Sequence, residues 1–282
     1  MRRTFGIALA LTLLLVPAVA VPVKSWGNGG FSADPTHPDY GIHDWIADKA
    51  LTFQVSDVRF LLTTYHADYL VGTEAPDNGD YIGDSRNHHV YYNESRTLQS
   101  DVGASRARQL YQSALASLKS SDYKQAAYYA GAMSHYISDL GAYGHTMGTS
   151  TVWGSSPHHE EYEDDVHSLT QSLASPRATA IAWNDPYNET LSLALKTTFG
   201  SGEIKPNTWM ESNFDWGNPA FRSSCLAALN ESVRAVASAL GFLLAQAGVG
   251  PVPEFSIDAC VLILATTAIF AIALLRSRED SQ

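Results

Sequence analysis

The sequence predicts an all-α protein, with a single multi-helix domain between two apolar ends. Two observations predict this class, and a third excludes another one. Apolar side chains recur at intervals of three and four residues in several stretches, whereas the alternation typical of strands is scarce. Glycine and proline gather in a few short segments, where we expect loops. The 282 residues include only 2 cysteines, which excludes a disulfide scaffold.

The expected helices follow one another through the middle of the chain. In chain order they are 43–51, 58–69, 110–118, 126–140, 161–173, 191–199 and 221–247. The last is the longest, and Leu229, Val233 and Leu240 lie on one stripe of it. Loops are expected at 26–41, 72–84, 200–219 and 248–253. One domain of about 220 residues is the simplest architecture for this order.

The first 25 residues have the organisation of a secretory signal peptide. Arg2 and Arg3 precede an apolar run from Phe5 to Val16, and an Ala-x-Ala site ends at Ala20. We expect cleavage after residue 20 or after residue 25. Only the second position frees the amino group of Trp26.

The other end is expected to anchor the chain in the cell membrane. After a linker at 248–254, the apolar segment 255–275 is long enough to cross a bilayer at about 1.5 Å per residue. Arg276 and Arg278 follow, so the tail 276–282 is expected in the cytoplasm and the domain 26–247 outside the cell. The order Pro253-Glu254-Phe255, apolar helix, basic tail resembles PEF-CTERM signals, which implies processing by a sorting enzyme.

The domain between these ends is acidic. Of the 18 Lys and Arg and 29 Asp and Glu in the chain, five and four lie in the ends, which leaves 13 and 25 in residues 27–253 and a net charge of −12. Such a surface repels a phosphate backbone, which excludes a passive nucleic-acid binder unless a metal ion intervenes.

Histidines and carboxylates recur at a spacing that suits a metal ion. His135 and Asp139 are four residues apart in a helical stretch, and His159 and Glu163 repeat the arrangement. This spacing places both side chains on one face of a helix, one turn apart. His145 follows a glycine that is expected to end the preceding helix. Imidazole nitrogen and carboxylate oxygen are donors that suit Zn²⁺.

These residues resemble the zinc-dependent phospholipase C family, whose pattern is His-x3-Asp-x5-His followed later by His-x3-Glu. The resemblance covers about residues 26–245 and is carried by the five residues His135, Asp139, His145, His159 and Glu163. The related S1/P1 nucleases share the fold and a three-zinc site. They typically have a wider gap after the third histidine, and a Gly-Gly-Asn segment that is absent after His145.

The resemblance also implies ligands upstream of this motif. They are His43 on an early helix, Asp77 in a loop, His89 before two tyrosines, and the terminal amine and carbonyl of Trp26. His88 is the rival of His89, which we prefer because Val-Tyr-Tyr follows it.

The family likeness implies two or three zinc ions, depending on the signal cleavage site. One would take Asp77, His89, His135 and Asp139; a second would take His145, His159 and Glu163; a third would take Asp139, His43 and Trp26. Asp77 is the candidate to orient or deprotonate the attacking water.

The expected activity is that of a membrane-anchored zinc-dependent phosphoric diester hydrolase of phospholipase C type, with a phospholipid as substrate. One alternative is an S1/P1-like nuclease or phosphomonoesterase, the one case in which nucleic acid is a partner. It needs an aromatic cleft, for which the candidates are Trp153, Trp183, Trp209 and Trp216. The other is a non-catalytic surface module that zinc stabilises. No protein partner is inferred, and the sequence leaves the lipid head group and the oligomeric state open.

Overall fold

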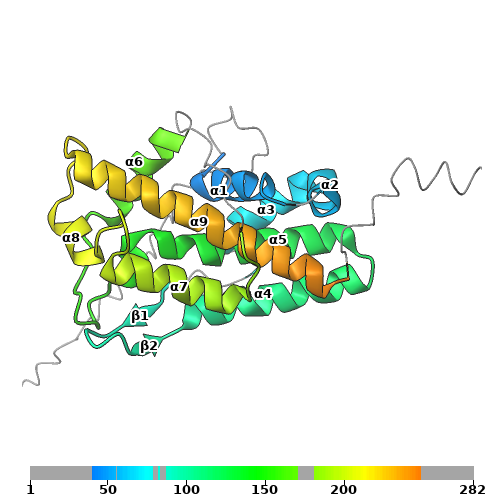
Figure 1. Ribbon diagram of the computed structural model, residues 1–282, viewed down its shortest axis with the longest axis horizontal. Coiled ribbons are helices and arrows are strands. Elements are labelled where there is room, and N and C mark those ends of the chain that lie inside the picture. Colours follow the sequence, from blue (N-terminus) through cyan, green and yellow to red (C-terminus); the bar gives the residue numbers. More distant parts are fainter. Residues whose placement is uncertain (1–39, 55, 79–81, 83–86, 171–180, 249–282) are drawn as a thin grey trace, which may run out of the picture.

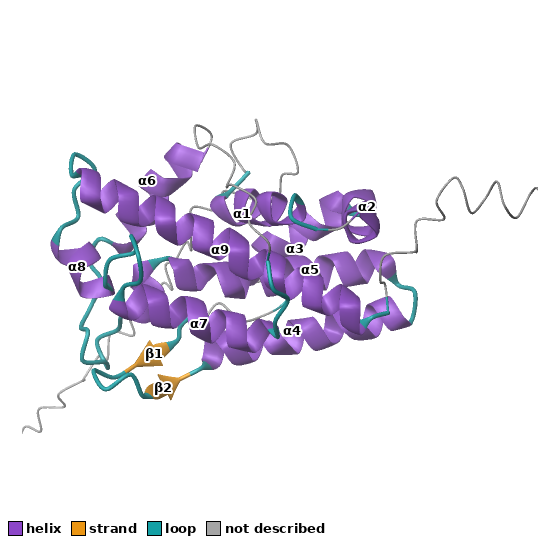
Figure 2. Cartoon of the chain, in the orientation of Figure 1, coloured by secondary structure: helices purple, strands orange, loops and turns teal. Residues whose placement is uncertain are grey.

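The computed structural model describes residues 40–54, 56–78, 82, 87–170 and 181–248 (Figure 1). Over these residues helices dominate, and one antiparallel hairpin is the only sheet (Figure 2). The elements are α1 (Ile42–Leu51), α2 (Ser56–Thr64), α3 (His66–Asn78), β1 (Tyr91–Tyr92), β2 (Leu98–Ser100), α4 (Val102–Lys119), α5 (Tyr123–Ser138), the 3₁₀ turns η1 (Asp139–Gly141) and η2 (Tyr143–Thr146), α6 (His159–Thr170), α7 (Pro186–Phe199), α8 (Asn207–Ser212) and α9 (Pro219–Gln246). The predicted all-α class is confirmed.

Local sequence explains where three of the helices begin. Asp122, Asp185 and Asn218 precede α5, α7 and α9, and each side chain accepts a hydrogen bond from a backbone N–H of the first turn. Such caps satisfy backbone donors that have no partner inside the helix. Proline occupies the first position of both α7 and α9, where its missing N–H costs nothing.

Helix α9 is the longest element and packs against α1, α5 and α7. The residues of the predicted stripe, Leu229, Val233 and Leu240, are buried. Among the described residues α9 is the one helix that is long and apolar enough to cross a membrane, yet 67% of its most apolar 18-residue window is buried inside the domain. That burial is typical of a core helix.

The segments expected to target and anchor the chain lie beyond the described residues. The predicted signal peptide 1–25, the spanning segment 255–275 and the tail 276–282 lie outside the described residues, as does the linker beyond Gly248.

Two glycines bring α3 and α5 into backbone contact. A Cβ at Gly72 would lie 2.1 Å from the carbonyl oxygen of Tyr128, and one at Gly131 would lie 1.9 Å from that of Tyr69. Any larger residue at either position would push the helices apart. This crossing sets the distance between the C-terminal half of α3 and the C-terminal half of α5, where the candidate site residues lie.

Several predicted boundaries were wrong. The loop expected at 72–84 begins as helix, because α3 continues to Asn78 with Pro76 inside it. Gly72 was interpreted as a loop residue, but it serves the crossing with α5. The helix expected at 58–69 is divided between α2 and α3, and the one around 110–118 is the second half of the longer α4. The loop expected at 200–219 contains α8.

Candidate metal centre

Helix α5 carries the two residues at the middle of the site. His135 lies in its last turn and Asp139 follows directly in η1, and both side chains are completely buried. Nδ1 of His135 donates a hydrogen bond of 2.6 Å to the carbonyl oxygen of Thr73 in α3. This contact directs Nε2 of the same ring toward Asp139 Oδ2, at 3.3 Å. A backbone acceptor on one imidazole nitrogen is a common way to hold the other nitrogen ready for a metal.

The carboxylate of Asp139 lies between histidines from four segments of the chain. Its Oδ1 is 3.2 Å from Nε2 of His43 in α1 and 3.7 Å from Nε2 of His145 in η2. Its Oδ2 is 2.7 Å from Nδ1 of His88, in addition to the contact with His135. Each oxygen therefore faces a different pair of imidazoles, which is the arrangement of a carboxylate able to bridge two cations.

His43 is oriented in the same manner as His135. Its Nδ1 lies 2.7 Å from the hydroxyl oxygen of Ser138, whose own hydrogen goes to the carbonyl oxygen of His135 at 3.0 Å. The ring of His43 stacks on that of His135 with centroids 3.9 Å apart. The Ser138 hydroxyl therefore holds a ring from α1 against a ring from α5.

Among the described residues, three groups place one donor atom of each member within 4.8 Å of the others. They are His43, His135 and Asp139; Asp77, His88 and His135; and His145, His159 and Glu163. The first two share His135, and His145 of the third group approaches Asp139. The groups therefore form one continuous cluster.

The third group is assembled by η2 and the first turns of α6. Glu163 Oε1 is 2.6 Å from Nε2 of His159 and 3.3 Å from Nε2 of His145. The two imidazole rings stand at 90° with centroids 4.7 Å apart. Gly144 makes the approach possible, because a Cβ there would lie 2.3 Å from the His159 ring.

Burial and the neighbouring charges act against each other in this cluster. Burial lowers the pKa of His43, and it lowers that of His145 well below its usual value. At His135 burial also disfavours the charged form, but the charges of Asp139 and Asp77 outweigh it and raise the pKa well above 6.5. For Asp139 burial acts to raise the pKa, yet the charge of His135 and the hydrogen bond from it hold the pKa well below the usual value. A buried carboxylate that stays ionised among imidazoles is a donor set suited to a divalent cation.

Most of the residues predicted from the sequence meet in this cluster. The structure brings together His43, Asp77, His135, Asp139, His145, His159 and Glu163. The predicted ligand Trp26 lies outside the described residues.

The preference for His89 over His88 is not supported. His88 joins Asp77 and His135, whereas the ring of His89 stacks on Tyr91 at 5.5 Å and lies 5.3 Å from the His145 ring. Successive side chains of an extended segment point to opposite sides, and the Val-Tyr-Tyr that follows does not fix which side faces the cluster.

Thr73 and Ser138 are positioning residues that sequence reasoning missed. Thr73 acts through its backbone carbonyl, which no side-chain pattern can reveal. Ser138 directly precedes Asp139, so its place in the motif offered a weak signal.

Three of the four candidate tryptophans pack at separate places. Trp153 Nε1 donates to the carbonyl oxygen of Tyr92 at 2.6 Å, and the Trp153 ring lies edge-on to Phe199. The Trp216 ring packs against Tyr162 and Phe221. The Trp183 ring lies against Gly241 of α9. These contacts give no specific support to a cleft in which nucleotide bases would stack.

Comparison with known structures identifies the fold. A crystal structure of alpha-toxin from an avian strain of Clostridium perfringens aligns with a TM-score of 0.54 and 17% identity, over 78% of this chain and 66% of the toxin. The alpha toxin of Clostridium absonum aligns with a TM-score of 0.55 and 14% identity, over 73% and 64%. This chain therefore spans just under two thirds of the length of these toxins.

The described residues thus have a helical fold similar to that of the matched part of the clostridial alpha-toxins, and at these identities the likeness concerns the fold alone. The fold agrees with the one that the resemblance to zinc-dependent phospholipases C implies. No family model matches the sequence, and the search of curated proteins found no match.

Proposed function

We propose that the domain 26–247 is a zinc-dependent phosphodiesterase that hydrolyses a phospholipid in the manner of a phospholipase C. The observation that carries this proposal is the position of Asp139, whose two carboxylate oxygens face four histidine nitrogens within 3.7 Å. The matching ligand order and the fold shared with the alpha-toxins support it.

In the proposed centre the three groups of side chains would hold two zinc ions, or three if signal cleavage frees Trp26. Asp77, His88, His135 and Asp139 would form one site, and His145, His159 and Glu163 another. His43 and Asp139 would complete a third site together with the amine of Trp26. When bound, zinc supplies a Lewis acid that makes water a nucleophile at neutral pH and offsets charge on the phosphoryl group.

Asp77 is our candidate for a catalytic residue beyond metal binding. Its Oδ1 is 3.5 Å from Nε2 of His135 and 4.0 Å from Nδ1 of His88, at the C-terminal end of α3. Its side chain is 9% exposed, whereas that of Asp139 is fully buried. A carboxylate at the edge of the centre can reach a water molecule as well as a metal, and would orient that water or accept its proton.

The location of the domain belongs to the same proposal. A signal peptide at 1–25 would export it, and the segment 255–275 would hold it at the outer face of the cell membrane unless a sorting enzyme acts at Pro253-Glu254-Phe255. This position would place the centre near its lipid substrate.

A substrate panel tests the proposed activity. Purified full-length protein in detergent, loaded with zinc, is assayed on phosphatidylcholine, phosphatidylinositol, single-stranded DNA and bis(nitrophenyl) phosphate. We expect release of a phosphorylated head group and hydrolysis of the nitrophenyl ester, both lost on chelation and restored by zinc. Faster cleavage of DNA than of any lipid would favour the nuclease alternative. Zinc binding without any hydrolysis would favour the non-catalytic module.

A further inference from the structure

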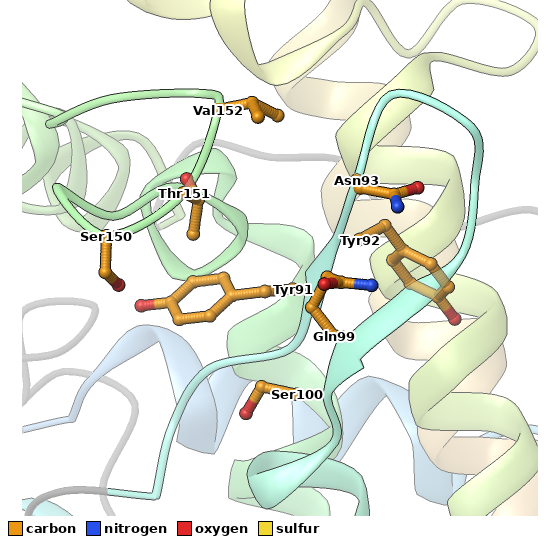
Figure 3. Close-up of a pocket in the computed structure, with 8 residues that line it drawn as sticks. All are labelled: Tyr91, Tyr92, Asn93, Gln99, Ser100, Ser150, Thr151 and Val152. Atoms are coloured by element: carbon orange, nitrogen blue, oxygen red, sulfur yellow. The ribbon is translucent and has the colours of Figure 1, made fainter.

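A cavity of about 410 Å³ lies between the β1–β2 hairpin and the loop that follows η2 (Figure 3). Its size falls in the range of small-molecule sites. The hairpin contributes Tyr91, Asn93 and Ser100, and the loop contributes Ser150 and its two following residues. In Figure 3 the Tyr91 ring extends between the two segments, toward Ser150.

A chain of ring contacts joins the cavity to the candidate metal centre. One face of the Tyr91 ring stacks on His89 with centroids 5.5 Å apart, and the His89 ring lies 5.3 Å from that of His145. The backbone N–H of Val90 also donates to the carbonyl oxygen of His145 at 3.3 Å. The His89 ring therefore lies between Tyr91 and the predicted zinc ligand His145.

The residues that line the cavity carry no charge. All eight are tyrosine, serine, threonine, asparagine, glutamine or valine. A cationic head group would require a carboxylate or open aromatic faces. The lining has no carboxylate, and of its two aromatic rings Tyr91 has one face taken by His89 and Tyr92 packs against Phe199, so no cage of several aromatic faces surrounds the cavity. An anionic head group would require lysine, arginine or a cluster of backbone donors.

Some of the polar groups that line the cavity form hydrogen bonds within the protein, and others do not. Tyr92 donates its hydroxyl hydrogen to the carbonyl oxygen of Leu191, and Thr151 donates to that of Gly148. Among the described residues, the structure gives no hydrogen-bond partner to the hydroxyls of Tyr91, Ser100 and Ser150. Neutral hydroxyl groups that can both donate and accept are suited to the hydroxyls of a sugar or polyol.

We propose that this cavity binds the head group of the substrate lipid and that this head group is an uncharged polyol. The inference rests on the proposed function and names the substrate class of that site. The phosphate of such a lipid would lie at the metal cluster, and its polyol would extend past Tyr91 into the cavity.

The test compares head groups on the zinc-loaded full-length protein. Rates are measured on phosphatidylinositol and on phosphatidylcholine in the same detergent micelles, with bis(nitrophenyl) phosphate as a substrate that has no polyol. Two variants alter the cavity: Tyr91→Phe removes one hydroxyl and keeps the ring, and Val152→Trp fills the rim at a residue that is 60% exposed. Tyr123→Phe is the matched control, because Tyr123 begins α5 and does not line the cavity.

We expect the wild-type protein to prefer phosphatidylinositol. Tyr91→Phe should reduce that preference about three- to tenfold through KM, the value of one neutral hydrogen bond, and Val152→Trp should reduce it further. Tyr123→Phe should keep the wild-type preference.

A wild-type preference for phosphatidylcholine, or an unchanged preference in both cavity variants, would overturn this inference and leave the phosphodiesterase proposal intact. Hydrolysis of neither lipid nor ester would overturn both.

Discussion

Nδ1 of His88 lies 2.7 Å from Oδ2 of Asp139, although 51 positions separate the two residues in the chain. The contact joins an extended segment before the hairpin to the end of α5, and neither segment would form a metal site alone. Because His88 makes this contact and the neighbouring His89 does not, a comparison of variants at these two positions tests the geometry directly.

Replacing His88 should therefore lower the affinity for zinc more than replacing His89 does. For His88→Ala we expect zinc affinity to fall more than about tenfold, because the site with Asp77 and His135 loses a ligand. His89→Ala is the matched change one residue away. Competition with a chromophoric chelator measures both affinities. Loss of zinc in His89→Ala but not in His88→Ala would reverse the assignment.

The close contact between η2 and α6 predicts that a larger residue at Gly144 disturbs the second zinc site. In Gly144→Ala the new methyl group would lie 2.3 Å from the His159 ring, so the ring must move away from His145 and Glu163. We expect one zinc ion fewer per chain and a destabilisation of about 1–3 kcal/mol, the usual cost of overpacking.

Gly217→Ala is the control for this change, because the three atoms nearest to its methyl group belong to the exposed Asp215 side chain, the first at 3.0 Å. Zinc content and urea unfolding measure the two effects. Wild-type zinc content in Gly144→Ala would show that the ring adapts without loss of the site.

The His66–Asp48 pair predicts a pH-dependent contribution to stability away from the cluster. His66 Nε2 lies 2.5 Å from Asp48 Oδ1, and this hydrogen bond raises the pKa of His66 although burial opposes the shift. A raised folded-state pKa adds stability that is complete below the usual value of 6.5 and is lost as the pH rises through the folded-state pKa.

His66→Gln should therefore lower the free energy of unfolding more at pH 5.5 than at pH 9, by less than about 1 kcal/mol because the pair is partly exposed. Urea unfolding with chelator present keeps metal binding out of the comparison. The pH dependence should vanish when Asp48→Asn is the background. An equal cost of His66→Gln at both pH values would contradict the role of the pair.

The parts of the site that follow from helix geometry were predictable from sequence. His135 and Asp139, and likewise His159 and Glu163, are one helical turn apart, so the spacing itself places them together. The core stripe of α9 was predictable for the same reason. The apolar periodicity of a helix is contained in its own local sequence.

The other parts of the candidate site depend on contacts between distant segments of the chain, which the local sequence does not reveal. Asp77 reaches His135 because Gly72 and Gly131 let α3 and α5 touch, and nothing in the local sequence distinguishes a glycine at a helix crossing from one in a loop. The segment of His88 is held against η2 by the hydrogen bond from the Val90 N–H to the His145 carbonyl oxygen. This contact between distant segments determines that His88 points toward the cluster. The Thr73 carbonyl that orients His135 carries no side-chain signature.

The zinc content of Asp139→Asn tests the central claim most directly, because this carboxylate lies between the groups that would hold the ions. The measurement is metal per chain by native mass spectrometry after zinc loading, for wild type, for Asp139→Asn and for Asp164→Asn, an exposed aspartate of α6. We expect two or three zinc ions in wild type and in Asp164→Asn, and at least one ion fewer in Asp139→Asn. Wild-type zinc content in Asp139→Asn would contradict the account.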